Sequence, residues 1–273
     1  MKSLAISAVF VLCMYAGALF SFSTAAKDIH LQLRKRVESG AGGAWRPVTI
    51  NRTLQLSQTA IVICDMWDRH WCDGATNRVE KLARKMEPVL ERARAAGVLI
   101  IHAPSETMSF YANAPGRLLA ENAPAVTPPS DPTPQAYPAL PIDDSDGGCD
   151  TGNKEYKAWT RETPLLSIKP GDAISDKGSE IYNLIQERHI KTVLIMGVHA
   201  NMCILNRTFG IKQMTRWGVP CILVRDLTDA MYNPKSKPYV SHAAGTELVI
   251  EYIEKYGAPS VTSSQLMAAL QGR

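Results

Sequence analysis

The sequence lacks a dense cluster of basic side chains, although 30 Lys and Arg against 26 Asp and Glu leave a formal net charge of +4. Its most basic stretch is the three-residue run from Arg34 to Arg36. Nucleic-acid binding needs a clustered basic footprint, so we exclude nucleic acid as a partner. The chain also lacks an internal repeat. Its 273 residues are 45% hydrophobic and 21% charged, an ordinary globular composition that needs no disulfide bonds to build a core.

A long apolar run occurs at the N-terminus, over residues 4–22. Lys2 precedes it and the small residues 23–25 follow it, an order typical of a secretory signal peptide. A membrane anchor is the alternative, because the run approaches spanning length. The small residues at its end favour cleavage. We therefore expect residues 1–25 to be removed and the mature protein to be periplasmic or secreted, with no stable membrane anchor.

Cysteine is scarce, and its count is informative. Six are present, of which Cys13 lies in the expected signal peptide, leaving five at positions 64, 72, 149, 203 and 221. An odd number in an oxidising compartment leaves one free thiol. Cys64 and Cys221 lie in apolar strand patterns, where buried structural cysteine is usual. Cys72 and Cys149 lie in polar loops, and we predict that they form a disulfide in the exported protein, although the sequence alone does not fix connectivity.

The first part of the mature chain has the pattern of a β-hairpin. Residues 29–37 alternate apolar and polar side chains, and residues 46–56 are the expected partner strand. The glycine-rich segment 39–43 supplies the turn. We predict a hairpin extension over residues 26–58.

From residue 59 onward, short apolar runs alternate with amphipathic segments. The expected strands are 59–64, 98–103, 192–198, 220–226 and 259–262, and the expected helices are 77–96, 177–189, 203–217 and 241–256, with a short helix at the end. Buried strands separated by helices predict an α/β domain over residues 59–273, with three α/β/α layers around a mainly parallel sheet. In such sheets ligands bind beyond the carboxyl ends of the strands.

Residues 104–165 do not follow this alternation. They are rich in proline and contain the acidic loop DDSDGGCD at 143–150. A stretch of this length without regular structure is usually functional or flexible. We interpret it as an insertion that lies over the mouth of the site. The acidic loop lacks the EF-hand pattern, which favours a solvated loop over a calcium site.

Two side chains at the predicted strand ends are candidates for chemistry. Cys203 begins the helix that follows strand 192–198, where helix N–H groups lower a thiol's pKa and stabilise an oxyanion. Asp65 ends the first buried strand, where a carboxylate is costly unless it is solvated, paired or functional. Taken singly, each has an ordinary alternative: a small packed cysteine and a loop aspartate. Lys169 follows an apolar run, and alone it is most simply a surface charge.

Together these residues resemble the cysteine hydrolases of the isochorismatase and nicotinamidase superfamily, over roughly residues 59–65, 98–103 and 165–262. The matching segments are VICDMWD around Asp65, SIKPGDAIS around Lys169, GVHANMCI around Cys203, and VRDLTDA after the next strand. Each motif is weakly specific by itself, and their order and spacing carry the likeness.

The resemblance implies a mechanism. Asp65, Lys169 and Cys203 become the catalytic residues, and a non-proline cis peptide between Val198 and His199 turns the N–H groups of His199 and Cys203 into an oxyanion hole. Asp65 accepts the thiol proton, Lys169 stabilises the charges, and the thiolate forms an acyl-enzyme. The presence of Cys203 favours hydrolysis of an amide-like C–N bond in a small molecule. The resemblance also admits a homo-oligomer.

Departures from the family pattern narrow the prediction. The second strand is followed by IHAPSETMSF, with one histidine and no Asp-x-His motif, so we expect no metal and no cofactor. Trp67 stands where the family usually has Gln, which changes the polarity of the pocket. We expect substrate contacts from Trp67, His70, His102 and Asp229.

Three alternatives remain open from the sequence. His70, His102 and His199, with Asp68, all follow strand ends and would serve a metal-dependent hydrolase. A secreted protein that only binds a small molecule on this fold is a second reading. A phosphatase with an Asp nucleophile is a third, but it needs a second Asp at the position of Trp67.

Overall fold

A single mixed sheet of eight strands organises the protein, in the order β2-β1-β8-β7-β6-β3-β4-β5. This computed structural model describes residues 28–40, 43–130 and 136–272, so the expected signal peptide lies outside the described residues. The strands are β1 (Asp28–Ser39), β2 (Ala44–Gln55), β3 (Thr59–Cys64), β4 (Leu99–Ala103), β5 (Ala173–Ile174), β6 (Thr192–Val198), β7 (Cys221–Asp229) and β8 (Ser260–Val261). The helices are α1 (Asp73–Ala95), α2 (Pro115–Glu121), α3 (Gly178–Glu187), α4 (Cys203–Asn206), α5 (Ile211–Arg216), α6 (His242–Tyr256) and α7 (Ser263–Gln271).

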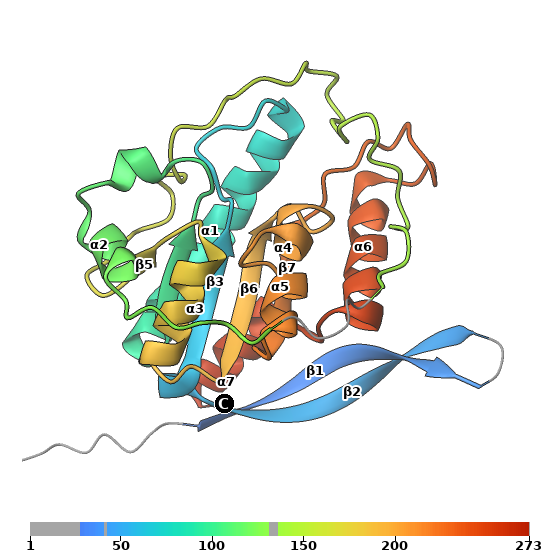
Figure 1. The fold of residues 1–273 in the computed structure, drawn as a ribbon. Helices are drawn as coiled ribbons and strands as arrows, with labels where there is room; N and C mark the ends of the chain where they lie inside the picture. Colours follow the sequence, from blue (N-terminus) through green and yellow to red (C-terminus); the bar gives the residue numbers. More distant parts are fainter. Residues whose placement is uncertain (1–27, 41–42, 131–135, 273) are drawn as a thin grey trace, which may run out of the picture.

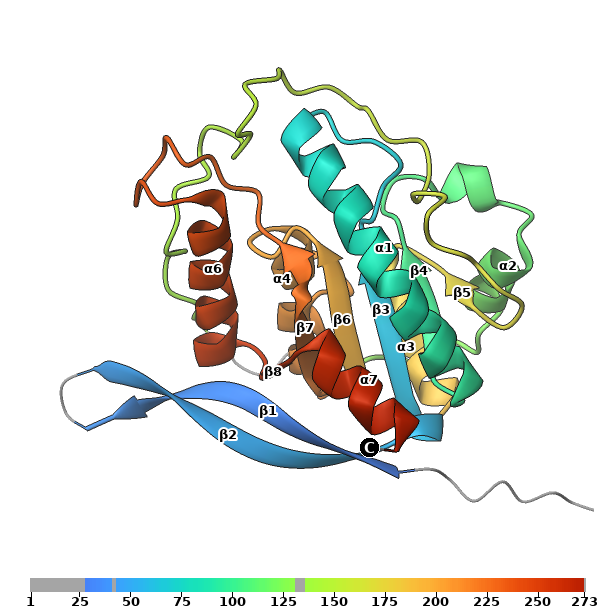
Figure 2. The same ribbon diagram turned by 180° about the vertical axis from the view of Figure 1, so that it is seen from behind.

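Helices cover both faces of the sheet, which confirms the predicted three-layer α/β/α architecture. Helices α3, α4 and α5 lie on the face toward the viewer in Figure 1, and α1 and α7 lie on the opposite face in Figure 2. Strands β3 to β8 run parallel to one another. Their carboxyl ends therefore meet at one edge of the sheet, where a site is expected. Within the described part of the chain, no helix is both long and apolar enough to cross a membrane.

The central strands are buried on both faces, as their continuous apolar sequences predicted. In β3, Val62 and Cys64 pack into the core under α3, α4 and α5, while Ile61 and Ile63 pack into the core under α1 and α7. This alternation follows from the two-residue period of a strand. It fixes the point at which β3 ends and the chain emerges beyond the sheet, at Asp65.

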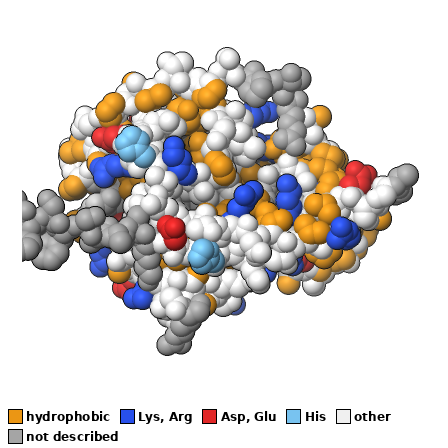
Figure 3. Space-filling view, turned by 90° about the horizontal axis from the view of Figure 1, so that it is seen from below, with side chains coloured by type: hydrophobic (Ala, Val, Ile, Leu, Met, Phe, Trp, Pro, Cys, Tyr) orange, Lys and Arg blue, Asp and Glu red, His pale blue; other side chains and the backbone are white. Residues whose placement is uncertain are grey.

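The N-terminal hairpin is present and extends the main sheet. Strands β1 and β2 pair antiparallel along their whole length, and β1 then pairs with β8 through Arg34 and Ser260. Apolar β1 side chains pack into the core beneath α7, and Arg34 forms ion pairs with Glu247 and Glu254 of α6. On the face seen from below in Figure 3, basic side chains are scattered among hydrophobic and uncharged ones.

The expected insertion is more ordered than the sequence suggested. Helix α2 begins at Pro115 and packs against β5 and α3. The returning chain then passes above the sheet in Figure 1 and forms an antiparallel bridge between Trp67 and Glu162. Cys72 and Cys149 form a disulfide, as predicted, which ties the segment to the start of α1. Oxidation of this pair in an exported protein stays a prediction.

The expected helix over 203–217 is wrong in one respect: it is broken into α4 and α5. Helix α4 ends after one turn because Arg207 is extended, with φ −59° and ψ 157°. Gly210 then precedes α5, and a Cβ at this glycine would meet the carbonyl oxygen of Ile204 at 2.8 Å. The break directs residue 207 back toward the end of β3.

Candidate active site

Asp65 and Cys203 meet beyond the carboxyl end of the sheet, as the strand-end rule predicted. Asp65 has φ 48° and a fully buried side chain. Its Oδ1 accepts the backbone N–H of Ser105 at 2.7 Å, and its Oδ2 accepts Arg207 Nε–H at 3.1 Å. Cys203 is a half-buried residue, and its thiol donates to the same carboxylate. Asp65 is thus placed to accept the thiol proton.

The chain between β6 and Cys203 forms a sharp elbow. Gly197 has φ +115°, and a Cβ there would lie 2.1 Å from the Cys64 carbonyl oxygen, so only glycine fits. The next peptide, Val198–His199, is cis, as the resemblance implied. The N–H of His199 points at the Cys203 sulfur. A donor in this position is where an oxyanion hole requires one.

The protonation of the pair differs from the expected one. Burial raises the pKa of Asp65, although Arg207, Cys203 and Ser105 oppose the shift. Burial and the nearby Asp65 carboxylate also raise the pKa of the Cys203 thiol. The predicted lowering of the thiol pKa by a helix N-terminus is therefore wrong, because α4 is a single turn and the sulfur is shielded from water. The resting site holds a neutral thiol beside a proton acceptor.

The structure does not bring Lys169 to Asp65 and Cys203. Lys169 is exposed, and its backbone N–H donates to Asp172 Oδ2 at 2.8 Å. Arg94, near the end of α1, donates to the Ser167 carbonyl and to Asp172, which ties this segment to the C-terminal part of α1. The partners of the Asp65 carboxylate are instead Ser105, Cys203 and Arg207. The expected set of three catalytic residues is therefore not assembled.

Arg207 is the cation beside Asp65, and the sequence reasoning missed it. It lies four residues after Cys203, a spacing that places both side chains on one face of a helical turn. That spacing was the available signal. Within the described chain, Arg207 is the basic side chain that forms an ion pair with Asp65. Ser105, two residues after β4, was also missed.

Aromatic side chains pack together near the elbow. Trp67 is buried and stacks on Trp159, with ring centroids 4.3 Å apart and planes at 14°. His70 lies against Trp159 and meets His199 edge to face at 5.1 Å. Trp67 and His70 thus lie close to the elbow, and their contact with a substrate stays a prediction. Trp159 comes from the insertion, and periodicity gave no signal for it.

An open pocket lies beside the thiol. Cys203 and Arg207 line an open pocket of about 450 Å³ with Asn201 and Asn206. Met202 and two residues of the insertion, Leu140 and Asp144, complete the lining. The insertion therefore reaches the mouth of the site, where the sequence placed it.

His102 lies away from this pocket, contrary to the expectation of a substrate contact. Its side chain is fully buried between Glu162, at 2.6 Å from Nδ1, and Asp172, at 3.2 Å from Nε2. Burial opposes the charge, but the two carboxylates raise the pKa of His102 to about 9. The imidazolium is a structural charge, because its position inside β4 directs the ring toward the loops that carry these acids.

The histidines do not form the alternative metal site. His102 is held by carboxylates, and Asp68 accepts hydrogen bonds from Thr160. His70 Nδ1 accepts the N–H of Cys72, and burial lowers the pKa of His70 to about 4. Among the described residues, metal-ligand spacing occurs at Cys72, Cys149 and Asp150, whose two sulfurs are already joined. In the described part of the chain, His102 and Asp68 are therefore already paired with protein partners.

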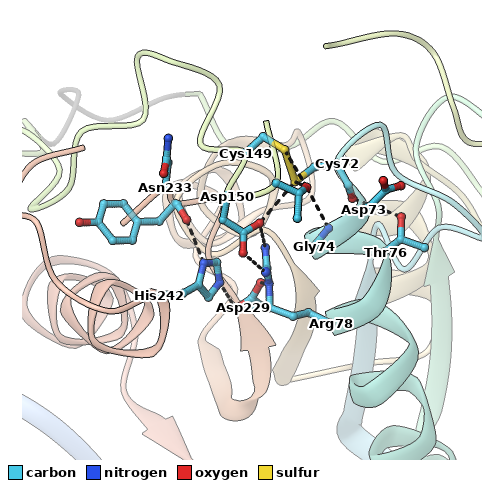
Figure 4. A network of polar contacts seen from close by, with 12 residues as sticks. Cys72, Asp73, Gly74, Thr76, Arg78, Cys149, Asp150, Asp229, Asn233 and His242 are labelled. Carbon is cyan, nitrogen blue, oxygen red and sulfur yellow. Dashed lines mark hydrogen bonds and ion pairs between the residues drawn. A yellow bond between two sulfur atoms is a disulfide. The ribbon is translucent and has the colours of Figure 1, made fainter. Parts of the chain in front are cut away.

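Asp229 also has a structural environment (Figure 4). Its Oδ2 accepts Arg78 Nε–H at 2.8 Å, and its Oδ1 lies 2.9 Å from His242 Nε2. Arg78 pairs in addition with Asp150, next to the disulfide. Burial opposes the shift, but His242 and Arg78 lower the pKa of Asp229. The expected role in substrate binding finds no support here, because both oxygens are already paired.

Comparison with known proteins identifies the family of the domain. The isochorismatase domain profile matches residues 59–264. A cysteine hydrolase from Pseudomonas syringae pv. phaseolicola 1448A shares the fold at a TM-score of 0.52 and 16% identity, covering 80% of this chain and 95% of that one. An isochorismatase from Pseudomonas putida KT2440 is similar at a TM-score of 0.48 and 14% identity, covering 77% of this chain and 91% of that one. Pyrazinamidase of Pyrococcus horikoshii, solved in complex with zinc, is similar at a TM-score of 0.44 and 15% identity, covering 75% of this chain and 99% of that one.

A search of curated proteins gave no match. The domain profile spans most of the chain, and it includes both Asp65 and Cys203. This protein belongs to the isochorismatase family and has the fold of its hydrolases.

Proposed function

We propose that the protein is a cysteine hydrolase that cleaves an amide-like C–N bond of a small molecule. The contact between the Cys203 thiol and the buried Asp65 carboxylate carries this proposal. A buried carboxylate of raised pKa next to a neutral thiol is suited to accept its proton. The N–H of His199, aimed at the sulfur, supplies the matching donor for an oxyanion.

The chemistry follows from these positions. Asp65 takes the thiol proton as sulfur attacks the carbonyl carbon, and the N–H groups of His199 and Cys203 hold the negative oxygen. Asp65 then returns the proton to the leaving nitrogen, and a thioester remains on Cys203. Water next gives a proton to Asp65 and attacks the thioester. The acid product leaves, and the proton returns to sulfur.

The decisive experiment is a screen of small amides, ureides and related compounds with purified protein lacking residues 1–25. We expect release of ammonia or an amine from at least one compound, and a loss of this activity in Cys203→Ala. Intact mass spectrometry under rapid quenching should detect the acyl adduct on Cys203. If no compound reacts, or if Cys203→Ala keeps full activity, the protein is instead a binding protein on this fold.

We infer further that the protein works outside the cytoplasm. The N-terminal signal pattern and the Cys72–Cys149 disulfide support this inference, because disulfides persist mainly in oxidising compartments. Cell fractionation with N-terminal sequencing is the test. A cytoplasmic protein that retains Lys2 and has both thiols reduced contradicts it.

A further inference from the structure

We propose that Arg207, and not Lys169, is the positioning cation of this site: its guanidinium holds the Asp65 carboxylate in place for proton exchange with Cys203. This inference rests on the proposed function. It departs from the sequence motif, which assigned the role to Lys169.

The charge of Asp65 is buried and needs a nearby cation. The Asp65 side chain is fully buried, and Arg207 Nε lies 3.1 Å from its Oδ2. A buried carboxylate without a counter-charge is strongly unfavourable. Within the described residues, Arg207 supplies the ion pair of Asp65. Lys169 is exposed and lines a different pocket, beside Pro115 and Arg188.

Backbone hydrogen bonds hold Arg207 at a fixed position relative to Cys203. The N–H of Arg207 donates to the Cys203 carbonyl at 3.0 Å, and the Gly210 N–H donates to the Arg207 carbonyl at 2.7 Å. These bonds hold both side chains on one short turn. The same guanidinium that faces Asp65 also opposes the rise in the pKa of the Cys203 thiol. Arg207 therefore acts on both members of the proton-transfer pair.

The other ion pair of Arg207 is with an exposed acid. Arg207 Nη2 lies 3.5 Å from Glu106, which is exposed and pairs with Lys157 at 3.0 Å. Exposed pairs of this kind contribute little to stability, so Asp65 is the dominant partner. The Nε–H bond to Asp65 leaves the outer end of the guanidinium at the pocket that Cys203 lines.

Arginine also suits the role chemically. A guanidinium remains protonated at all working pH values, and its planar fork fixes the orientation of a carboxylate. Asp65 can then exchange a proton with the thiol while its neighbour keeps a constant charge. A lysine at this place would carry the charge but would lack the planar set of N–H donors that orients the carboxylate.

The test uses iodoacetamide and requires no substrate. The rate of alkylation of Cys203 is measured by peptide mass spectrometry between about pH 5 and about pH 10, a range in which a perturbed thiol pair titrates. The proteins are the mature wild type, Arg207→Gln, Arg207→Lys and Lys169→Gln. Lys169→Gln is the matched control, because it also removes one positive charge from the chain.

We expect Arg207→Gln to move the alkylation profile upward by at least about one pH unit, which is about a tenfold slower reaction at a given pH on the rising limb. Arg207→Lys should fall between this variant and wild type, and Lys169→Gln should superimpose on wild type. The proposal is overturned if Arg207→Gln superimposes on wild type or if Lys169→Gln shifts as far. If Arg207→Gln does not fold, as judged by thermal unfolding, Arg207→Lys decides by the same comparison with Lys169→Gln.

A substrate from the amide screen adds a second readout. Arg207→Gln should lower kcat by about 100-fold or more with a smaller change in KM, and Lys169→Gln should leave both within about twofold. An inactive wild type contradicts the proposed function, whereas the alkylation profiles still judge Arg207. The two ideas therefore fail separately.

Discussion

Two buried aspartates at the same edge of the sheet have opposite environments. Asp65 follows β3, and Asp229 ends β7. Burial raises the pKa of Asp65, because one partly exposed guanidinium and two weaker donors do not offset it. Burial also opposes ionisation at Asp229, but His242 and Arg78 outweigh it and lower the pKa. Similar positions on the fold therefore yield a proton acceptor in one case and a permanent anion in the other.

The difference indicates how a function is recognised in such a sheet. Asp229 has both oxygens paired in a network that joins β7, α1, α6 and the disulfide-bonded segment (Figure 4). That pairing stabilises the fold and leaves no proton to exchange near neutral pH. Asp65 is held less completely and touches a thiol. An acid whose charge is only partly compensated is the one available for chemistry.

The largest effect should come from Asp65→Asn. Loss of the proton acceptor should lower kcat/KM by about 10³-fold or more. The free energy of unfolding should stay the same or increase, because a carboxylate with a raised pKa is less stable in the fold than out of it. Steady-state kinetics and urea unfolding at neutral pH check the two halves. A large loss of stability would mean that Asp65 is structural, like Asp229.

Asp229→Asn should have the opposite profile. Removing one charge from a buried network leaves Arg78 and His242 poorly compensated, so the free energy of unfolding should fall by about 3–5 kcal/mol. On folded protein below its melting temperature, kcat/KM should change by less than about tenfold. Urea unfolding of Asp229→Asn and Asp65→Asn, measured side by side, provides the comparison. An Asp229→Asn variant that keeps full stability but loses activity contradicts the prediction.

Opening the disulfide should weaken the Asp229 network more than the Asp65 centre. Cys72 and Cys149 are 77 residues apart, and closing a loop of that length typically contributes about 2–4 kcal/mol. We expect the Cys72→Ser, Cys149→Ser double variant to lose that stability while Cys203 stays reactive toward iodoacetamide. Thermal unfolding with and without reductant measures it, with the reduced wild type as control. An unchanged melting temperature in both cases excludes a stabilising bridge.

The smallest effect should be a loss of stability at alkaline pH from His102. Its pKa is raised to about 9 in the folded protein from an ordinary value of 6.5. The stabilisation is therefore complete below about pH 6.5 and is lost as the pH rises through about 9, at a cost of up to about 3 kcal/mol. Urea unfolding across this range measures it. His102→Gln should flatten the decline, and a wild-type slope that persists in the variant assigns the effect to other groups.

The sequence predicted much of this arrangement because the signals are local. Strand and helix periodicity placed β3, β4, β6 and β7 within a few residues, and the strand-end rule then placed Asp65 and Cys203 at one edge. The glycine pattern before Cys203 led, through the family resemblance, to the cis peptide at Val198–His199. For His102, Asp229 and Lys169, the structure shows other contacts than the sequence predicted. Their neighbours come from distant segments that periodicity does not describe.

What the sequence by itself determined is the order of buried strands, the fold class and the meeting of Asp65 and Cys203 at one edge of the sheet, since each depends on the spacing of neighbouring residues. Only the tertiary structure decided which cation reaches Asp65. Asp65 and Arg207 are 142 residues apart, and their contact requires the break between α4 and α5. Protonation was likewise decided by packing, because burial and partners brought from elsewhere in the chain set the charge that each acid carries.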